Sequence, residues 1–125
     1  MKPPQLLIVE DEILLAMDME ARLAEMGFCV VDKAGTGAAA IAAAEQHHPD
    51  LILMDIRLSG DMDGIAAASE IRRHHDIPVI FMSAYTDDKT RQRAATAEPA
   101  GFLSKLTDDR ALRTAIETVL AGHPD

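Results

Sequence analysis

The chain has 125 residues, the usual size of one domain, so we expect a single domain over residues 1–125. Its 12 basic and 21 acidic residues give a net charge of −9, which argues against a nucleic-acid surface, because such a surface needs clustered Lys and Arg. No apolar stretch approaches the ~20 residues of a membrane span, and the N-terminus lacks the pattern of a signal peptide. We therefore expect a soluble, cytoplasmic protein without a membrane partner.

Short apolar runs alternate with helical patterns along the whole chain. Three of the runs, the first, third and fourth, are continuously apolar, which is typical of strands buried on both faces of a parallel sheet. In chain order the predicted elements are strand Leu6–Val9, helix Ile13–Met26, strand Cys29–Val31, helix Gly37–His47, strand Leu51–Met54, helix Gly64–His74, strand Val79–Met82, helix Asp87–Ala97, strand Gly101–Leu103 and helix Asp108–Ala121.

Residues that end or begin helices support these bounds. Glycine or proline follows four of the predicted helices, and two threonines stand where N-caps are expected. The residues concerned are Gly27, Pro49, Pro78 and Gly122 at helix ends and Thr86 and Thr107 at helix starts. Five strand–helix units in succession imply right-handed crossovers and an α/β, doubly wound, five-stranded parallel sheet. The flavodoxin-like (βα)5 fold with strand order 2-1-3-4-5 is the natural candidate.

Several polar or reactive residues receive structural interpretations. Cys29, the only cysteine, stands in an apolar run, and we expect a small buried thiol with a structural role. The pairs His47–His48 and His74–His75 end predicted helices, where histidines commonly interact with the helix dipole, so we do not expect them to bind metal. The second strand ends in Asp32–Lys33 at the sheet edge, and we expect these residues to lie outside the functional site.

The other four strands are each followed by residues that can carry chemistry. Glu10 and Asp11 follow the first strand, Asp55 the third, Ser83 the fourth and Lys105 the fifth. Ligands of such sheets bind at the carboxyl ends of the strands, next to the point where the strand order reverses. We therefore expect these five side chains to converge on one crevice.

Three carboxylates in one crevice repel one another. At ~4 Å and an effective dielectric constant of ~20, each pair costs on the order of 4 kcal/mol. Lys105 offsets only part of this cost, so the oxygen-rich site predicts a bound Mg²⁺, or Mn²⁺ in its place. A carboxylate such as Asp55 can attack phosphorus to form an acyl phosphate, while the metal, Lys105 and the Ser83 hydroxyl stabilise the phosphoryl oxygens.

With these residues in place, the chain resembles the bacterial two-component response-regulator receiver family from about Leu6 to Leu120. One matching tetrapeptide would be weak support, but five motifs in order, each at its expected strand end, are specific. They are Val9-Glu-Asp-Glu12, Leu53-Met-Asp-Ile56, Met62-Asp-Gly64, Met82-Ser-Ala84 and Gly101-Phe-Leu-Ser-Lys105.

The resemblance implies a role for each matching residue of the acidic pocket. Asp55 resembles the phosphoacceptor, and it would bind Mg²⁺ together with Asp11 and the backbone carbonyl of Arg57. Glu10 stands where the family usually has Asp, and it would hold the metal through a water molecule. Lys105 resembles the lysine that pairs with the phosphoryl oxygens.

The resemblance also implies a switch and its partners. Ser83 matches the switch hydroxyl, and Phe102 matches the aromatic residue that turns inward after phosphorylation. The phosphoryl group would come from a sensor histidine kinase or a histidine phosphotransfer protein, and it would select one of two conformations of the surface that a downstream protein target binds. Such a protein is a signalling phosphoacceptor and not an enzyme acting on a separate substrate.

Two loops depart from the family pattern. Leu106 follows Lys105 where the family has proline, often after a cis bond. A cis bond before a non-proline residue costs ~2.5–4 kcal/mol, so we expect a trans bond. The stretch Arg57–Met62 is one residue longer than the usual loop and lacks its proline. The bulk of Arg57 and Tyr85, each two positions past a site residue, predicts a long-lived phosphoryl group.

Three alternative functions compete with this interpretation. A haloacid-dehalogenase-type phosphatase needs a second Asp at the position that Arg57 occupies, and a nucleotide binder needs a Gly-rich loop where this chain has acidic residues. The serious alternative is a pseudo-receiver, the same fold used as an interaction module without phosphorylation. Leu106 favours that alternative, whereas the complete acidic site argues against it.

Overall fold

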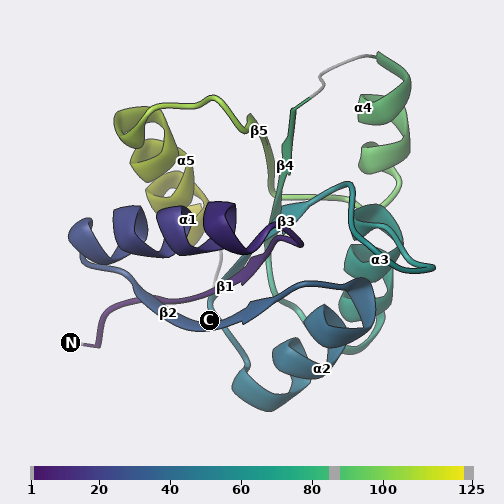
Figure 1. The fold of residues 1–125 in the computed structure, drawn as a ribbon, viewed down its shortest axis with the longest axis horizontal. Coiled ribbons are helices and arrows are strands. Elements are labelled where there is room, and N and C mark those ends of the chain that lie inside the picture. Colours follow the sequence, from purple (N-terminus) through teal and green to yellow (C-terminus); the bar gives the residue numbers. More distant parts are fainter. Residues whose placement is uncertain (1, 85–87, 123–125) are drawn as a thin grey trace.

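The computed structural model describes residues 2–84 and 88–122, which form one five-stranded sheet flanked by helices (Figure 1). Thr86, Tyr85 and the first residue of the predicted fourth helix lie outside the described residues. The elements are β1 (Gln5–Val9), α1 (Ile13–Glu25), β2 (Cys29–Ala34), α2 (Gly37–His47), β3 (Leu51–Asp55), α3 (Gly64–His74), β4 (Val79–Ser83), α4 (Asp88–Ala95), β5 (Gly101–Ser104) and α5 (Asp109–Gly122).

The strands are parallel and lie in the order β2-β1-β3-β4-β5. Helices α1 and α5 cover one face of the sheet, and α2, α3 and α4 cover the other (Figure 1). The predicted doubly wound, flavodoxin-like fold is therefore confirmed. In this order β1 and β3 are neighbours whose connections run to opposite sides, and the crevice at that switch point is where such sheets bind ligands.

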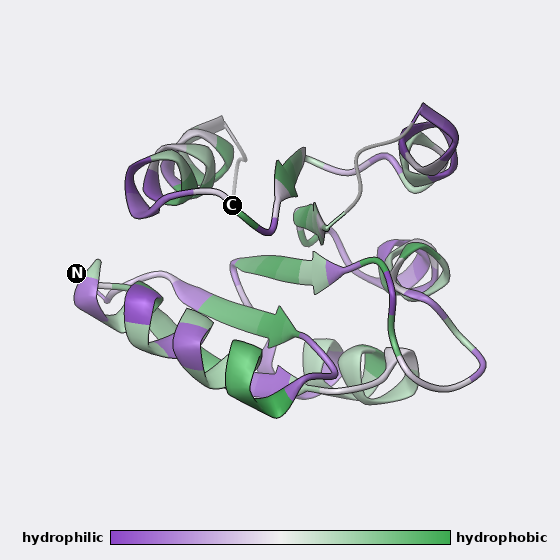
Figure 2. Cartoon of the chain, turned by 45° about the horizontal axis from the view of Figure 1, so that its top comes forward, coloured by the Kyte–Doolittle hydropathy of each residue, from purple (hydrophilic) through white to green (hydrophobic). Residues whose placement is uncertain are grey.

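The sheet separates two apolar cores, and alternate residues of each central strand serve one core or the other. In β1, Leu6 and Ile8 pack toward α1 and α5, whereas Leu7 and Val9 pack toward α2 and α3. Strands β3 and β4 are buried at all five of their positions, as their continuous apolar runs predict. Figure 2 shows the apolar strands in the middle and polar turns of helix around them.

Strand β2 differs because it is an edge strand. Its first residue, Cys29, is exposed, so the prediction of a buried thiol is wrong. The apolar run around Cys29 gives no sign that only one neighbouring strand covers it. The strand also runs on to Ala34, so Asp32 and Lys33 lie within it, where they contact His47 and Glu20, respectively.

Most helix ends follow the predicted pattern, with two corrections at α5. Gly27 follows α1 with a φ of 93°, a conformation that glycine adopts at little cost. The N-cap of α5 is Asp108 and not Thr107, because the Asp108 carboxylate accepts a 2.8 Å hydrogen bond from the backbone N–H of Ala111. Gly122 is the last residue of α5 and does not follow it. Across residues 2–84 and 88–122, no helix combines the length and apolar character needed to cross a membrane.

Gly64 is the glycine whose missing side chain matters most to the sheet edge. Its backbone N–H donates a 2.8 Å hydrogen bond to the carbonyl of Ile56, which brings the start of α3 against the end of β3. A Cβ here would lie 2.9 Å from the carbonyl carbon of Asp55 and closer still to its oxygen. No alternative rotamer can relieve a clash with backbone, so this position has to remain glycine.

We expect Gly64→Ala to lower the free energy of unfolding by about 3 kcal/mol, the upper range for forced overpacking. Urea unfolding followed by circular dichroism measures the change. Gly122→Ala is the matched control, since a Cβ at Gly122 meets nothing within 4 Å, and this variant should be neutral or up to about 1 kcal/mol more stable. Equal stabilities of the two variants would show that the backbone can move apart at Gly64 without cost.

Candidate functional site

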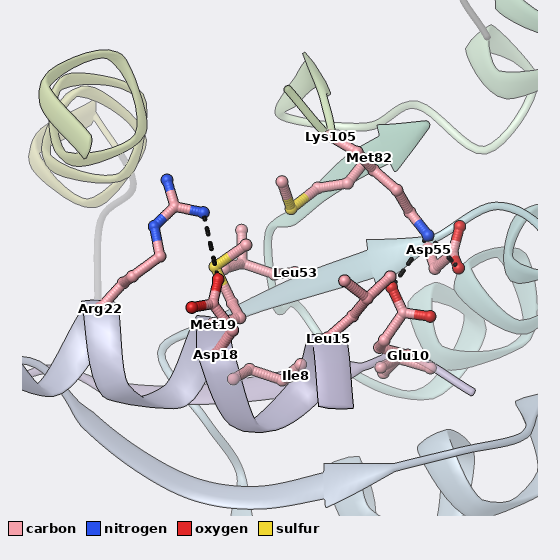
Figure 3. A pocket seen from close by; sticks show the side chains of 11 residues that line it. Ile8, Glu10, Leu15, Asp18, Met19, Arg22, Leu53, Asp55, Met82 and Lys105 are labelled. Carbon is pink, nitrogen blue, oxygen red and sulfur yellow. Dashed lines mark hydrogen bonds and ion pairs between the residues drawn. The ribbon is translucent and has the colours of Figure 1, made fainter. Parts of the chain in front are cut away.

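Charged side chains at the ends of three strands lie close together. Glu10 follows β1, Asp55 ends β3 and Lys105 follows β5. The ammonium Nζ of Lys105 lies 2.8 Å from Asp55 Oδ2 and 2.9 Å from Glu10 Oε1 (Figure 3). One cation thus joins two carboxylates that stand 95 and 50 residues away from it along the chain.

Asp55 is buried, with 5% of its surface exposed, because β3 is the central strand of the sheet. Its Oδ1 accepts a 3.2 Å hydrogen bond from the backbone N–H of Arg57. Burial raises the pKa of Asp55 to about 6, although the hydrogen bond from Lys105 acts in the opposite direction. Burial would lower the pKa of Lys105, but its hydrogen bonds to Asp55 and Glu10 outweigh this and raise that pKa. Both groups are therefore charged at neutral pH.

Asp11 has a partner that the sequence analysis did not identify. The hydroxyl of Ser59 donates a 2.9 Å hydrogen bond to Asp11 Oδ2, and this bond holds the pKa of Asp11 below its usual value. Ser59 lies in the lengthened loop after β3 and forms an isolated bridge with Thr36, the residue before α2. A serine in a polar loop, 48 residues from its partner, carries no local pattern that would reveal this contact.

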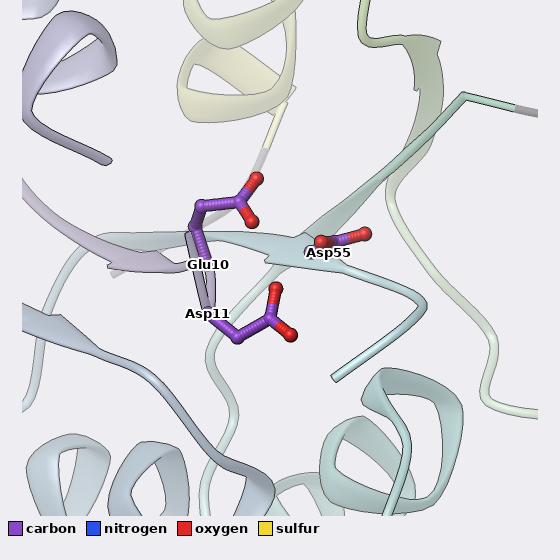
Figure 4. A group of neighbouring side chains, drawn as sticks. All are labelled: Glu10, Asp11 and Asp55. Atoms are coloured by element: carbon purple, nitrogen blue, oxygen red, sulfur yellow. The ribbon is translucent and has the colours of Figure 1, made fainter. Parts of the chain in front are cut away.

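Glu10, Asp11 and Asp55 form an acidic cluster in which one oxygen from each carboxylate lies within 4.8 Å of the others (Figure 4). With Lys105 the four groups carry a net charge of −2 when all are ionised. Such a set of carboxylate oxygens fits Mg²⁺ or Mn²⁺, which prefer hard oxygen ligands. Within the described parts of the chain, no comparable group of three side chains contains a histidine.

The remaining predicted residues lie at the same edge or beside it. Ser83 ends β4 and is buried, and its backbone carbonyl accepts a 3.0 Å hydrogen bond from the N–H of Lys105. Phe102 pairs with Phe81 in the register of β5 and β4 and is partly buried against the core under α2, α3 and α4. The guanidinium carbon of Arg91, on α4, lies 5.0 Å from the centre of the Phe102 ring, within the range of a cation–π contact.

The loop after Lys105 follows the expectation for Leu106. No peptide bond of the described residues is cis, so the Lys105–Leu106 bond is trans. The side chain of Leu106 is 91% exposed and adds no packing to the loop. The turn instead forms around Ser104, whose Oγ accepts a hydrogen bond from the N–H of Leu106 and whose carbonyl accepts one from the N–H of Thr107, both 3.1 Å long.

Comparison with known proteins agrees with this geometry. Residues 6–117 match the response regulator receiver domain. The chain belongs to this family. Receiver domains are signalling modules, not conventional enzymes; they typically bind Mg²⁺ and interact with histidine kinases and downstream targets.

Individual relatives are regulators longer than this chain. It is 37% identical over 119 residues to the transcriptional regulatory protein PdtaR of Mycobacterium tuberculosis, which covers 95% of this chain and 58% of PdtaR. It is 39% identical over 103 residues to the phyllosphere-induced regulator PhyR of Methylorubrum extorquens, covering 81% of this chain and 38% of PhyR. The signal receiver domain of the response regulator NarL from Mycobacterium tuberculosis superposes with a TM-score of 0.91 at 27% identity, over 98% of this chain and 99% of that one.

The raised pKa of Asp55 predicts how stability depends on pH. Below about pH 4 the folded and unfolded chains both hold this proton, so Asp55 does not lower the free energy of unfolding. As the pH rises from the usual value of 3.8 to about 6, the unfolded chain loses the proton first, so the free energy of unfolding falls. Above pH 6 the decrease in the free energy of unfolding is complete, and it is on the order of 3 kcal/mol for a pKa shift of this size.

Asp55→Asn should therefore be more stable than the wild type above pH 6, by an amount that shrinks toward pH 4. Urea unfolding at several pH values, in the absence of divalent cations, measures this difference. Addition of Mg²⁺ should stabilise the wild type more than the variant, because the metal offsets the charge that the variant lacks. A difference between the two proteins that stays constant from pH 4 to pH 7.5 would contradict the assignment of the shift to Asp55.

Proposed function

We propose that residues 1–125 form one cytoplasmic receiver domain that accepts a phosphoryl group on Asp55 in a Mg²⁺-dependent reaction. The donor is a sensor histidine kinase or a histidine phosphotransfer protein, and the phosphorylated domain changes its surface for a downstream protein target. The observation that carries this proposal is the buried Asp55 carboxylate, contacted at 2.8 Å by Lys105 and grouped with two further carboxylates.

Asp55 has the properties of an oxygen nucleophile toward phosphorus. Its two oxygens are oriented separately, one by Lys105 and one by the N–H of Arg57. In the transfer, one of these oxygens forms a bond to phosphorus while the bond from phosphorus to the donor imidazole nitrogen breaks. The electron pair of the broken bond returns to the imidazole nitrogen, and a proton already held by the other ring nitrogen makes the leaving group a neutral imidazole, so the receiver donates no proton. The chain supplies position and charge, and no separate base is required.

The acidic cluster would hold Mg²⁺ through Asp11 and Asp55, with Glu10 at one side. When bound, the cation supplies positive charge next to the phosphoryl oxygens and offsets the repulsion among the three carboxylates. The hydrogen bond from Ser59 keeps Asp11 ionised and oriented for this task. Family resemblance adds the backbone carbonyl of Arg57 as a further ligand.

Ser83 and Phe102 would transmit the phosphorylated state to the surface. The Ser83 hydroxyl is the donor that resemblance assigns to a phosphoryl oxygen, and its strand carries the carbonyl that anchors Lys105. Phe102 lies between the sheet and α4 and contacts Arg91 there. A change at Ser83 can thus alter the packing of α4 against β5, which supports a protein target on that surface.

Incubation with acetyl phosphate and Mg²⁺, followed by intact-mass analysis, tests the proposal. We expect one added phosphoryl group on the wild type, no addition on Asp55→Asn, and no addition when a chelator removes the metal. Mn²⁺ should restore the reaction. A folded wild type that stays unmodified under these conditions would favour the pseudo-receiver instead.

We expect Leu106→Pro to slow phosphorylation by acetyl phosphate severalfold. The variant loses a hydrogen bond that shapes the Lys105 loop, and such a bond is worth ~1 kcal/mol. Proline lacks the N–H that bonds to Ser104 Oγ. Leu106→Ala is the matched control, because it keeps the N–H and removes only an exposed side chain, and it should react like the wild type. A Leu106→Pro variant with wild-type kinetics would show that the turn does not set the position of Lys105.

A further inference from the structure

We propose that Arg22, on α1, is a positioning residue for phosphoryl transfer, because it holds the loop that carries Lys105 against the body of the domain. This inference rests on the proposed function of Asp55 and Lys105. Arg22 itself contacts neither of them, and it acts on the reaction only through the loop.

The Arg22 guanidinium contacts the loop at two points. Its Nη2 donates a 3.1 Å hydrogen bond to the backbone carbonyl of Thr107, and its Nε lies 2.5 Å from Asp109 Oδ1. Thr107 is two residues after Lys105, and Asp109 is the first residue of α5. The planar guanidinium therefore fixes the turn and the helix start together, which a single-point cation cannot do.

Lys105 itself is held by the bond from its N–H to the Ser83 carbonyl and by its ion pairs with Asp55 and Glu10. The two hydrogen bonds that shape the turn after it run back to Ser104, so they close the turn without fixing Leu106 and Thr107 relative to α1. The Leu106 side chain projects into solvent and contributes no packing. Arg22, 85 residues earlier in the chain, adds a second anchor at Thr107, and its own side chain is only 21% exposed.

A cavity separates Arg22 from the acidic cluster, so Arg22 can affect phosphoryl transfer only indirectly. A cavity of about 80 Å³ lies under α1, with Arg22 and Asp18 at one end and Glu10, Asp55 and Lys105 at the other (Figure 3). Its middle is lined by the apolar side chains of Leu15, Met19, Leu53 and Met82. The guanidinium therefore cannot serve as a second counter-charge for Asp55, and its route to the site is the backbone from Thr107 to Lys105.

The test compares Arg22→Met, which keeps the stem and removes the donors, with Arg22→Lys and with Arg73→Met. Arg73 is the matched control, an exposed arginine in the last turn of α3 whose ion pair with Glu70 is 3.3 Å long. We expect Arg22→Met to slow phosphorylation by acetyl phosphate at saturating Mg²⁺ about fivefold or more, in line with misplacement of a reacting group. The Mg²⁺ dissociation constant, measured by titration calorimetry, should stay within about twofold of wild type, because the proposed ligands Asp11 and Asp55 lie at the ends of other strands. Arg22→Lys should recover part of the rate, and Arg73→Met should match the wild type.

A double-mutant cycle separates positioning from general destabilisation. If Arg22 acts through Lys105, adding Arg22→Met to a Lys105→Met variant causes no further loss of rate. A loss that is additive with Lys105→Met, or a parallel loss of Mg²⁺ affinity, would overturn the proposal. So would an Arg22→Met variant that reacts at the wild-type rate.

Amide hydrogen exchange gives a readout that does not need phosphorylation. The N–H groups of Leu106 and Thr107 should exchange faster in Arg22→Met than in the wild type, while those of β3 stay unchanged. If the wild type is never phosphorylated, the function proposed for Asp55 fails, and exchange at Leu106 and Thr107 still decides whether Arg22 holds the loop. Unchanged exchange at both residues would overturn that role as well.

Discussion

The ion pair of Lys105 with Asp55 and Glu10 is the constraint on which the edge of this sheet depends. Strand β4 lies between β3 and β5, and with neighbouring strands ~4.8 Å apart the lysine must span close to 10 Å to meet Asp55. Only a long, flexible cationic side chain can do this. Without it, the Asp55 carboxylate would keep the hydrogen bond from the Arg57 N–H but would lack the cation that offsets part of its desolvation. The contact therefore ties the edge strand β5 to the centre of the sheet, and it requires β1, β3, β4 and β5 to have assembled.

The carboxylates around this lysine are neighbours in space but differ in character. Burial raises the pKa of Asp55, whereas a hydroxyl from the loop after β3 lowers that of Asp11. Two carboxylates of the same cluster thus differ in how readily they take up a proton, because their environments differ. The loop between β3 and α3 contributes to this difference by placing Ser59 beside Asp11.

Much of the fold and part of the candidate site could be predicted from the sequence, because both rest on local patterns. Continuous apolar runs mark β1, β3 and β4, and the polar residue that ends each run marks the functional edge. Most of the failures have a common cause. Whether Cys29 is buried depends on how many strands cover it, and the partners of Arg22 and Ser59 lie 85 and 48 residues away. Such tertiary contacts leave no periodic trace in the chain. The N-cap of α5 is a local error instead, since Thr107 and Asp108 are both suitable cap residues and the Asp108 carboxylate makes the contact.

The exposed thiol of Cys29 has a practical consequence. The chain contains no tryptophan and a single tyrosine, so its intrinsic fluorescence can report little about its state. One accessible cysteine on the outer strand, with β1 standing between it and β3, offers a unique attachment point for a maleimide dye or a spin label. A reporter placed there would sense motions of the sheet while leaving the acidic edge chemically untouched.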